Sequence, residues 1–378
     1  MRSSPIKVLH LRQSSNIWGP EKNNLGLCRG LAAHGFQCEI AIVYRRKKGE
    51  PAEHPLVAAA RVQGTAIAQL DGHAGRLLGS IRWLRDKLEA ENFSILHCHE
   101  YKTDLMGALA AWRIAKPRPA LVATVRHTEP GLQMVLFQSL DSLVLHRFDR
   151  LTVPSRGALG ELNRWPELAK RTQVIHHAVE EIFASPAPPL AGWPRRNGGP
   201  LISIVGRLQP VKGLHVFLEC ARKVREARPD AQFWIVGDGE LRRELETATL
   251  RLGLQDAVSF LGYRRDALQA MAASDVVVCT SSYEAFPRTM LEALALERPV
   301  VATAVGGIPE IVIDQETGIL TPAGDPASLA AGVLRLLNDR QYARRLAAAG
   351  RKLVTERFTV EAQASALAVL YREALACA

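Results

Sequence analysis

ISIVGRLQPVKGL, residues 202–214, combines a short apolar strand, a glycine-bounded loop and the start of a helix. The run Ile202–Val205 has the length and apolar character of a strand buried in a parallel sheet. The loop that follows holds two cations, Arg207 and Lys212. Because ligands of open parallel sheets bind at the carboxyl ends of strands, this loop is a candidate binding segment.

The same alternation of strand and helix extends in both directions from this stretch. Short apolar runs alternate with amphipathic stretches, which predicts parallel sheets covered by helices on both faces. The expected strands are residues 6–11, 39–44, 94–98, 121–125 and 150–153 in the first half, and 201–205, 232–236, 257–260, 276–279 and 299–302 in the second. Expected helices include 75–91, 326–337, 341–356 and 360–376. The fold class is therefore α/β, with two doubly wound Rossmann-like domains facing a cleft.

A segment rich in proline and glycine, ASPAPPLAGWPRRNGGP at residues 184–200, separates the two halves. A chain of 378 residues also exceeds what a single hydrophobic core usually organises. We expect an N-terminal domain at 1–183, a linker at 184–200 and a second domain at 201–359. A C-terminal helix at 360–378 is then free to cross back to the N-terminal domain.

Composition narrows the class of protein. The formal net charge of +10 favours anionic partners, but no RNA-binding signature, zinc finger or basic heptad pattern accompanies it, so we expect no nucleic acid. The six cysteines include no C-x-x-C pair, which indicates neither a zinc site nor a disulfide framework. No window offers about 18 consecutive apolar residues, and the apolar run at 6–11 lacks the length and the cleavage site expected of a signal peptide. We expect a cytoplasmic protein.

The loop at 206–213 carries the chemistry of a diphosphate clamp. Arg207 can fork two phosphate oxygens, and Lys212 adds a point charge. The helix that begins near Lys212 contributes free amides and the positive end of its dipole. The alternative is a pair of ordinary surface cations that flank a turn.

A second segment, SSYEAFPRTMLEA at residues 281–293, follows an apolar strand and enters a helix that Pro287 can open. Glu284 in the loop and Glu292 one to two turns into the helix can face the same side. Glu292 can accept hydrogen bonds from ribose hydroxyls, while Glu284 and the amides of residues 286–289 contact sugar and phosphate. The alternative is an exposed helix with unrelated acids.

Together these two segments resemble the donor site of family 4 glycosyltransferases, retaining enzymes of the GT-B fold and the group 1 type. The similarity rests on the E-x-F-P-x-x-x-L-E-A frame that starts at Glu284 and on the G-R-x-x-x-x-K-G loop that starts at Gly206. Further similar segments span the C-terminal half: 236–239, 260–263, 299–302, 306–310 and 317–318.

The resemblance implies a role for each matching residue. Arg207 and Lys212 hold the donor diphosphate, Glu292 binds the ribose, and Glu284 is catalytic beside the donor sugar. The other implied donor contacts are Phe286, Pro287, Arg288 and Thr289, with Tyr263 and Arg264 bordering the base. No cofactor is implied, and the chain contains no Asp-x-Asp metal motif, so no metal is expected.

The N-terminal half, implied to bind the acceptor, matches less closely. Gly19 lies in a W-G-P-E segment, residues 18–21, where relatives have G-G-x-E, and is implied to contact the donor. His127 aligns with a catalytic histidine near the donor sugar; the alternative is a histidine satisfied by local backbone. His97 and His99 can share one face, and we favour structural or acceptor-site roles over metal binding. The segment at residues 174–180, which holds His176 and His177, lacks the Asn-Gly turn that relatives commonly have there.

The expected function is transfer of a sugar, from a uridine diphosphate donor in preference to a guanosine diphosphate donor, to a hydroxyl of a glycan or lipid-linked acceptor. Such a transferase fits cell-surface polysaccharide or lipopolysaccharide synthesis, with peripheral contact at the anionic inner face of the plasma membrane. Alternatives are a nucleotide-sugar epimerase and a non-catalytic sugar-nucleotide-binding subunit. A dinucleotide oxidoreductase is disfavoured because no G-x-G-x-x-G follows either first strand.

Overall fold

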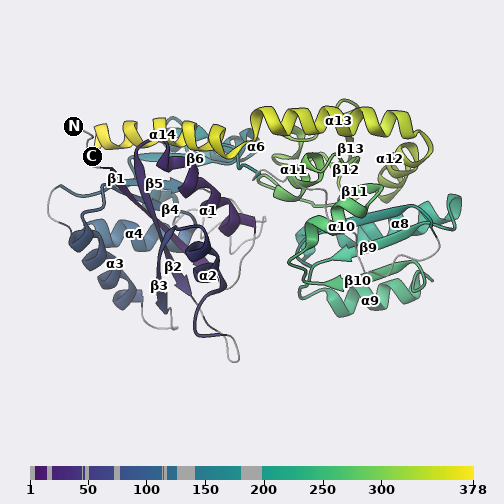
Figure 1. The fold of residues 1–378 in the computed structure, drawn as a ribbon, viewed down its shortest axis with the longest axis horizontal. Helices are drawn as coiled ribbons and strands as arrows, with labels where there is room; N and C mark the ends of the chain where they lie inside the picture. The colour runs from purple at the N-terminus through teal and green to yellow at the C-terminus, as the bar shows by residue number, and fades with distance from the viewer. Residues whose placement is uncertain are drawn as a thin grey trace. The chain divides into compact units, whose positions relative to one another are not determined.

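The computed structural model describes residues 5–14, 19–44, 46, 51–71, 77–112, 114, 117–125, 141–179 and 198–378. The chain forms two compact units (Figure 1). Unit 1 comprises residues 1–180 and 360–378, and unit 2 comprises residues 181–359. Each unit is built on one parallel sheet, as the sequence predicts. No described helix is both long and apolar enough to cross a bilayer.

The sheet of unit 1 has the strand order β3-β2-β1-β4-β5-β6-β7, with every pairing parallel. Its strands are β1 (Ile6–Ser14), β2 (Phe36–Tyr44), β3 (Ala66–Asp71), β4 (Ile95–Cys98), β5 (Ala120–Thr124), β6 (Arg150–Val153) and β7 (Thr172–Val174). The order reverses between β1 and β4, which makes this edge a topological switch point where doubly wound folds bind ligands.

Helices cover both faces of that sheet because successive strand residues point to opposite sides. In β1, Val8 packs with the helices on one face, whereas Leu9 packs with those on the other. The helices of unit 1 are α1 (Gly19–Ala32), α2 (Pro55–Val62), α3 (Leu77–Glu91), α4 (Tyr101–Trp112), α6 (Arg156–Glu161), η1 (Leu162–Arg164), α7 (Pro166–Ala169) and α14 (Val360–Cys377).

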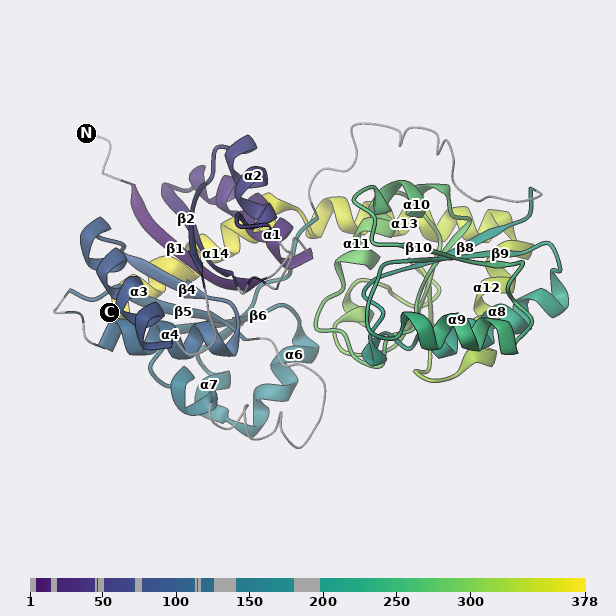
Figure 2. The ribbon, with the colours of Figure 1, turned by 90° about the horizontal axis from the view of Figure 1, so that it is seen from below.

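The C-terminal helix α14 returns to the N-terminal sheet, as the expected fold class allows. Its buried face, including Leu367, Leu370 and Tyr371, packs with Leu27 and Leu31 of α1 in one hydrophobic cluster. Figures 1 and 2 both show α14, in yellow, running along unit 1. The last helix of the chain is therefore part of the core of the first unit.

Unit 2 repeats the architecture with the strand order β10-β9-β8-β11-β12-β13, again all parallel. Its strands are β8 (Leu201–Val205), β9 (Gln232–Val236), β10 (Val258–Gly262), β11 (Val276–Cys279), β12 (Val300–Thr303) and β13 (Ile319–Thr321). Its helices are η2 (Pro210–Lys212), α8 (Leu214–Ala227), α9 (Arg242–Arg251), α10 (Ala267–Ala273), α11 (Arg288–Ala295), η3 (Ile308–Glu310), α12 (Pro326–Asn338) and α13 (Arg340–Arg357). The switch point lies between β8 and β11.

Every strand predicted from the sequence is present, and β3, β7 and β13 are additional. The predicted linker at 184–200 lies outside the described residues except for 198–200.

Candidate active site

Two loops meet in unit 2 at the point where the strand order reverses. β8 and β11 pair directly, with Ile202 opposite Val276 and Ile204 opposite Val278. The loop after β8, residues 206–213, and the loop after β11, residues 280–287, therefore start side by side at the carboxyl edge of the sheet. These are the two segments that the sequence singles out.

Hydrogen bonds between backbone and side chains fasten the two loops together. Thr280 donates from Oγ1 to the carbonyl of Lys212 at 2.6 Å, and the amide of Ser282 donates to the carbonyl of Val211 at 2.8 Å. Gly213 has φ +60°, and a Cβ there would lie 2.1 Å from the carbonyl oxygen of Thr280. Only glycine permits this approach of the two backbones.

The charged centre of the site is an ion pair between Lys212 Nζ and Glu284 Oε1. The hydroxyl of Ser281 also donates to Glu284 Oε1, at 2.8 Å. The Lys212 and Glu284 side chains are only 22% and 13% exposed, so water screens the pair less than it would on an open surface. Ser281 is not among the predicted site residues; the signal that could have found it is a hydroxyl just after a buried apolar strand.

A third loop, after β12, fixes the backbone of Glu284. The amide of Gly307 donates to the Glu284 carbonyl at 2.9 Å. Gly306 has φ +52°, and a Cβ there would lie 1.9 Å from the same carbonyl oxygen. Backbone contacts from two sides thus hold the carboxylate of Glu284 beside Lys212.

Arg207 differs from Lys212 because it is exposed and its side chain forms no ion pair or hydrogen bond within the described part of the chain. Arg207, Lys212, Glu284 and Thr289 all line one hollow over the ends of β8 and β11. The site therefore presents one cation without an internal partner and one cation that already has a carboxylate partner.

Helix α11 starts at Arg288, directly after Pro287, and carries Glu292 in its second turn as expected. Arg288 Nη2 lies 3.5 Å from Glu292 Oε1. The Phe286 ring is buried against Phe358 at a centroid distance of 5.4 Å, so its side chain serves packing.

Tyr263 and Arg264 follow the edge strand β10, two strands away from β8. Tyr263 is exposed, and Arg264 pairs with Asp266 at 2.7 Å. Neither residue is among the described residues that line the hollow.

Comparison with known proteins agrees with this architecture. The family model for glycosyl transferases group 1 matches residues 191–353, and the model for glycosyltransferase family 4 matches residues 19–181. A phosphatidyl-myo-inositol mannosyltransferase of Mycobacterium leprae is 32% identical over 281 residues, which cover 72% of this chain and 71% of that enzyme. The chain belongs to the group 1 glycosyltransferase family.

Two further similarities extend the family comparison. An alpha-D-kanosaminyltransferase of Streptomyces kanamyceticus is 32% identical over 176 residues, and the match spans 46% of each chain. The solved structure of Anabaena HepE with UDP and glucose has a TM-score of 0.81 at 22% identity, covering 96% of this chain and 98% of that one. The second similarity shows that this group 1 glycosyltransferase shares the overall GT-B fold.

In unit 1 of this group 1 glycosyltransferase, the predicted residues are only partly described. Gly19 is the first residue of α1, whereas Trp18 and His127 lie outside the described residues. His97 and His99 stack at a centroid distance of 4.2 Å. His97 lies within hydrogen-bonding distance of Tyr371 Oη (2.7 Å) and Thr124 Oγ1 (2.8 Å), so both of its ring nitrogens have partners within unit 1.

A buried ion network at the end of β1 is absent from the sequence predictions. Arg12, 3% exposed, pairs with Glu21 of α1 and with Glu100 after β4. Burial lowers the pKa of Arg12, but Glu100 and Glu21 outweigh it and raise the pKa above its ordinary value. A charged residue inside the apolar run of β1 is the signal that could have identified this network.

Proposed function

We propose that this glycosyltransferase transfers a sugar from a nucleotide diphosphate sugar to a hydroxyl of a glycan or lipid-linked acceptor. The observation that carries the proposal is the cationic hollow over β8 and β11, where Arg207 and Lys212 converge with Glu284. Unit 2 then binds the donor, with residues 201–359 as its domain, and unit 1 binds the acceptor.

The roles in the donor site follow from charge. Arg207 is available for a bidentate contact with phosphate oxygens, and Lys212 supplies a second positive charge. When the diphosphate draws Lys212 toward it, Glu284 remains beside the donor sugar. Glu292 and residues Phe286–Thr289 complete the donor contacts, with Phe286 and Pro287 contributing backbone.

We further propose retention of configuration without a catalytic metal. The leaving diphosphate removes the proton from the acceptor hydroxyl on the same face of the sugar. Arg207, Lys212 and the amides near the start of α11 stabilise the negative charge that develops on the leaving group. This arrangement performs the task that a divalent cation performs in other transferases.

The relatives support the proposed base and acceptor. HepE was solved with UDP and glucose, which supports a uridine donor for a chain of the same fold. The mycobacterial relative is named for a lipid acceptor, which supports a lipid-linked or glycan acceptor of cell-surface polysaccharide or lipopolysaccharide synthesis.

A donor panel screened by thermal shift tests the proposal. A ligand that binds only the folded protein raises apparent stability by mass action. We expect a uridine diphosphate sugar to raise the melting temperature more than guanosine or adenosine counterparts, with EDTA leaving the shift unchanged. A panel without any stabilising nucleotide sugar would contradict the donor assignment.

Incubation with the identified donor alone separates transfer from other activities. A transferase gives only slow hydrolysis, an epimerase converts the donor sugar, and a non-catalytic subunit leaves it intact even after acceptor is added. NMR of the product reports whether the anomeric configuration is retained, and an inverted product would reject the proposed mechanism.

A further inference from the structure

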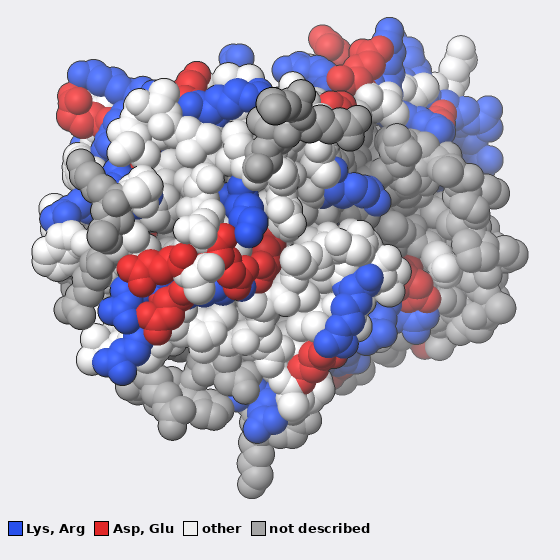
Figure 3. Space-filling model, turned by 60° about the vertical axis from the view of Figure 1, so that its left-hand side comes forward, with Lys and Arg blue, Asp and Glu red and all other residues white. Residues whose placement is uncertain are grey.

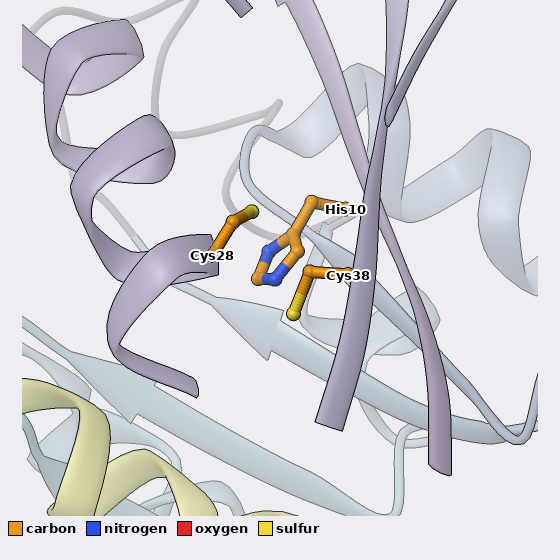
Figure 4. A group of neighbouring side chains, drawn as sticks. All are labelled: His10, Cys28 and Cys38. Carbon is orange, nitrogen blue, oxygen red and sulfur yellow. The ribbon is translucent and has the colours of Figure 1, made fainter. Parts of the chain in front are cut away.

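Unit 1 contains a cluster of metal-ligating side chains that its sequence spacing does not reveal. His10 on β1, Cys28 on α1 and Cys38 on β2 each offer a ligand atom, and these atoms all lie within 4.8 Å of one another. Figure 4 shows the His10 imidazole between the sulfur atoms of the two cysteines. The cluster therefore draws on three different elements.

The fold brings these residues together through sheet register. Cys38 pairs with Val8, and His10 is two residues farther along β1, so Cys38 and His10 project from the same face of the sheet. Helix α1 packs on that face and supplies Cys28. Cys28 and Cys38 are too far apart in sequence to form a C-x-x-C pair. The sequence pattern therefore gave no indication of a metal site.

The cluster is mostly buried, but one of its residues is partly exposed to solvent. His10 is 0% exposed and Cys28 is 5% exposed, whereas Cys38 is partly exposed. Nε2 of His10 is buried without a nitrogen or oxygen partner among the described residues. This nitrogen depends on the Cys38 sulfur or on a bound ion for a partner, because an unpaired buried imidazole nitrogen costs free energy.

The second ring nitrogen of His10 has the partner that a metal ligand requires. His10 Nδ1 lies 3.0 Å from His99 Nε2. Metal-binding histidines almost always use their other ring nitrogen in such a hydrogen bond, which fixes tautomer and orientation. By contrast, both nitrogens of His97 lie within hydrogen-bonding distance of oxygen atoms, so the neighbouring group of His10, His97 and His99 is a hydrogen-bond network.

The thiols of Cys28 and Cys38 are close enough to shift each other's pKa. The hydrogen bond between them lowers the pKa of Cys38, with a further hydrogen bond from His10 in the same direction and burial opposed, and it raises the pKa of Cys28 well above its ordinary value. The thiolate is the form of cysteine that binds metal ions.

We propose that His10, Cys28 and Cys38 form a zinc site in unit 1. Two sulfurs and one imidazole nitrogen are the donors that Zn²⁺ prefers, and three protein ligands leave one tetrahedral position for water. Ligand atoms around tetrahedral zinc lie roughly 3.5–3.8 Å apart, so closing the site requires shifts of only about 1 Å. Partial exposure of Cys38 gives the ion a route in.

Co²⁺ titration of the untagged full-length protein, prepared reduced and metal-free, tests this site. We expect a sulfur-to-cobalt charge-transfer band that saturates at one ion per chain and disappears when Zn²⁺ is added. Cys28→Ser and Cys38→Ser should abolish the band, whereas Cys377→Ser, at an exposed cysteine, should retain it. His99→Ala should keep the band but weaken affinity about tenfold or more, because it removes the orienting partner of His10.

A second measurement on the unmutated protein guards against variants that fail to fold. Zn²⁺ should slow alkylation of Cys28 and Cys38, mapped by mass spectrometry, and leave Cys377 unchanged. Absence of the band, a band that survives in both serine variants, or equal alkylation with and without Zn²⁺ would overturn the site. A Cys28–Cys38 disulfide that forms in air at the same rate with Zn²⁺ would overturn it as well.

Discussion

Arg207 and Lys212 carry the same charge but have different surroundings. Arg207 has no internal partner in the described structure, whereas Lys212 is paired with Glu284. A diphosphate can bind Arg207 without breaking a contact within the protein. It must share Lys212 with a carboxylate. The two cations should therefore respond differently to substitution.

For Arg207→Ala we expect donor affinity to fall by about tenfold to a hundredfold. Hydrogen bonds to charged groups contribute about 1.5–3 kcal/mol, and 1.4 kcal/mol corresponds to a factor of ten. Calorimetry with the preferred nucleotide sugar measures this loss. Arg243→Ala, at an exposed position on α9, removes the same charge elsewhere and should leave the affinity unchanged.

For Lys212→Ala we expect a larger loss of donor affinity than for Arg207→Ala. The substitution removes one cation and leaves the Glu284 carboxylate unpaired where it would repel the diphosphate. Adding Glu284→Gln removes that repulsion, so the double variant should bind donor more tightly than Lys212→Ala alone. If the two substitutions simply added, Glu284 would not be coupled to the bound diphosphate.

Glu284→Gln alone should separate catalysis from binding. The amide keeps the size of the side chain and can still accept the Ser281 hydrogen bond, but it loses the charge beside the donor sugar. We expect kcat to fall by a larger factor than donor affinity. Glu292→Gln should show the reverse order, because its proposed contact is the ribose. Wild-type turnover in Glu284→Gln would reject a catalytic role.

At the scale of elements, the site depends on three loops that touch through backbone. Gly213 lets the loop after β8 approach the backbone of Thr280. Gly306 lets the loop after β12 approach the backbone of Glu284. A side chain at either position would push these loops apart. The position of Lys212 relative to Glu284 is therefore set mainly by backbone packing.

Gly213→Ala should destabilise unit 2 and weaken donor binding together. The backbone at residue 213 has φ +60°, which disfavours alanine, and the new Cβ would lie 2.1 Å from the carbonyl oxygen of Thr280. Gly253→Ala is the matched control, because its φ is +67° but a Cβ there meets nothing within 4 Å. We expect Gly253→Ala to cost only the left-handed conformation, about 1–2 kcal/mol, and to keep donor affinity. Urea unfolding and calorimetry compare the two, and equal effects would show that the loop contact is unimportant.

Sequence reasoning succeeded where apolar burial governs structure. Continuous runs such as Val276–Cys279 are buried strands and were predicted. It missed β7, Thr172–Val174, and β13, Ile319–Thr321, because strands of three residues carry too little pattern and depend on pairing with a neighbour. It also missed β3, Ala66–Asp71, which is longer but lies at the edge of the sheet and lacks a continuous apolar run.

The same limit applies to the site. Arg207, Lys212 and Glu284 were predicted from charge after strands and, for Glu284 mainly, from the family resemblance. Lys212 and Glu284 are 72 residues apart, and only the β8–β11 register makes them partners. The cluster of His10 with two cysteines arises from tertiary contacts in the same way, whereas Ser281 is only three residues from Glu284 in the same loop. Pattern can suggest which residues bind, whereas pairing between distant residues requires the fold.

At the scale of the whole molecule, the chain carries a formal net charge of +10, which favours binding to an anionic partner such as a membrane surface. Much of the basic surface is locally compensated: α8 pairs Arg222 with Glu219 and Glu226, and α9 pairs Arg242 with Glu246. The face drawn in Figure 3 also shows acidic side chains beside basic ones. Attraction to a membrane therefore rests on the excess of cations over acids.

We expect the full-length protein to bind vesicles of phosphatidylcholine with phosphatidylglycerol at low salt, and to leave them as salt rises. Each cation near an anionic surface contributes about 1 kcal/mol, and the screening length falls from roughly 30 Å at 0.01 M salt to 10 Å at 0.1 M. Sedimentation with vesicles of pure phosphatidylcholine is the control and should recover no protein. If the protein fails to sediment with anionic vesicles at low salt, its acceptor must reach it without electrostatic help from the bilayer. Binding that is unaffected by salt would instead indicate an apolar contact.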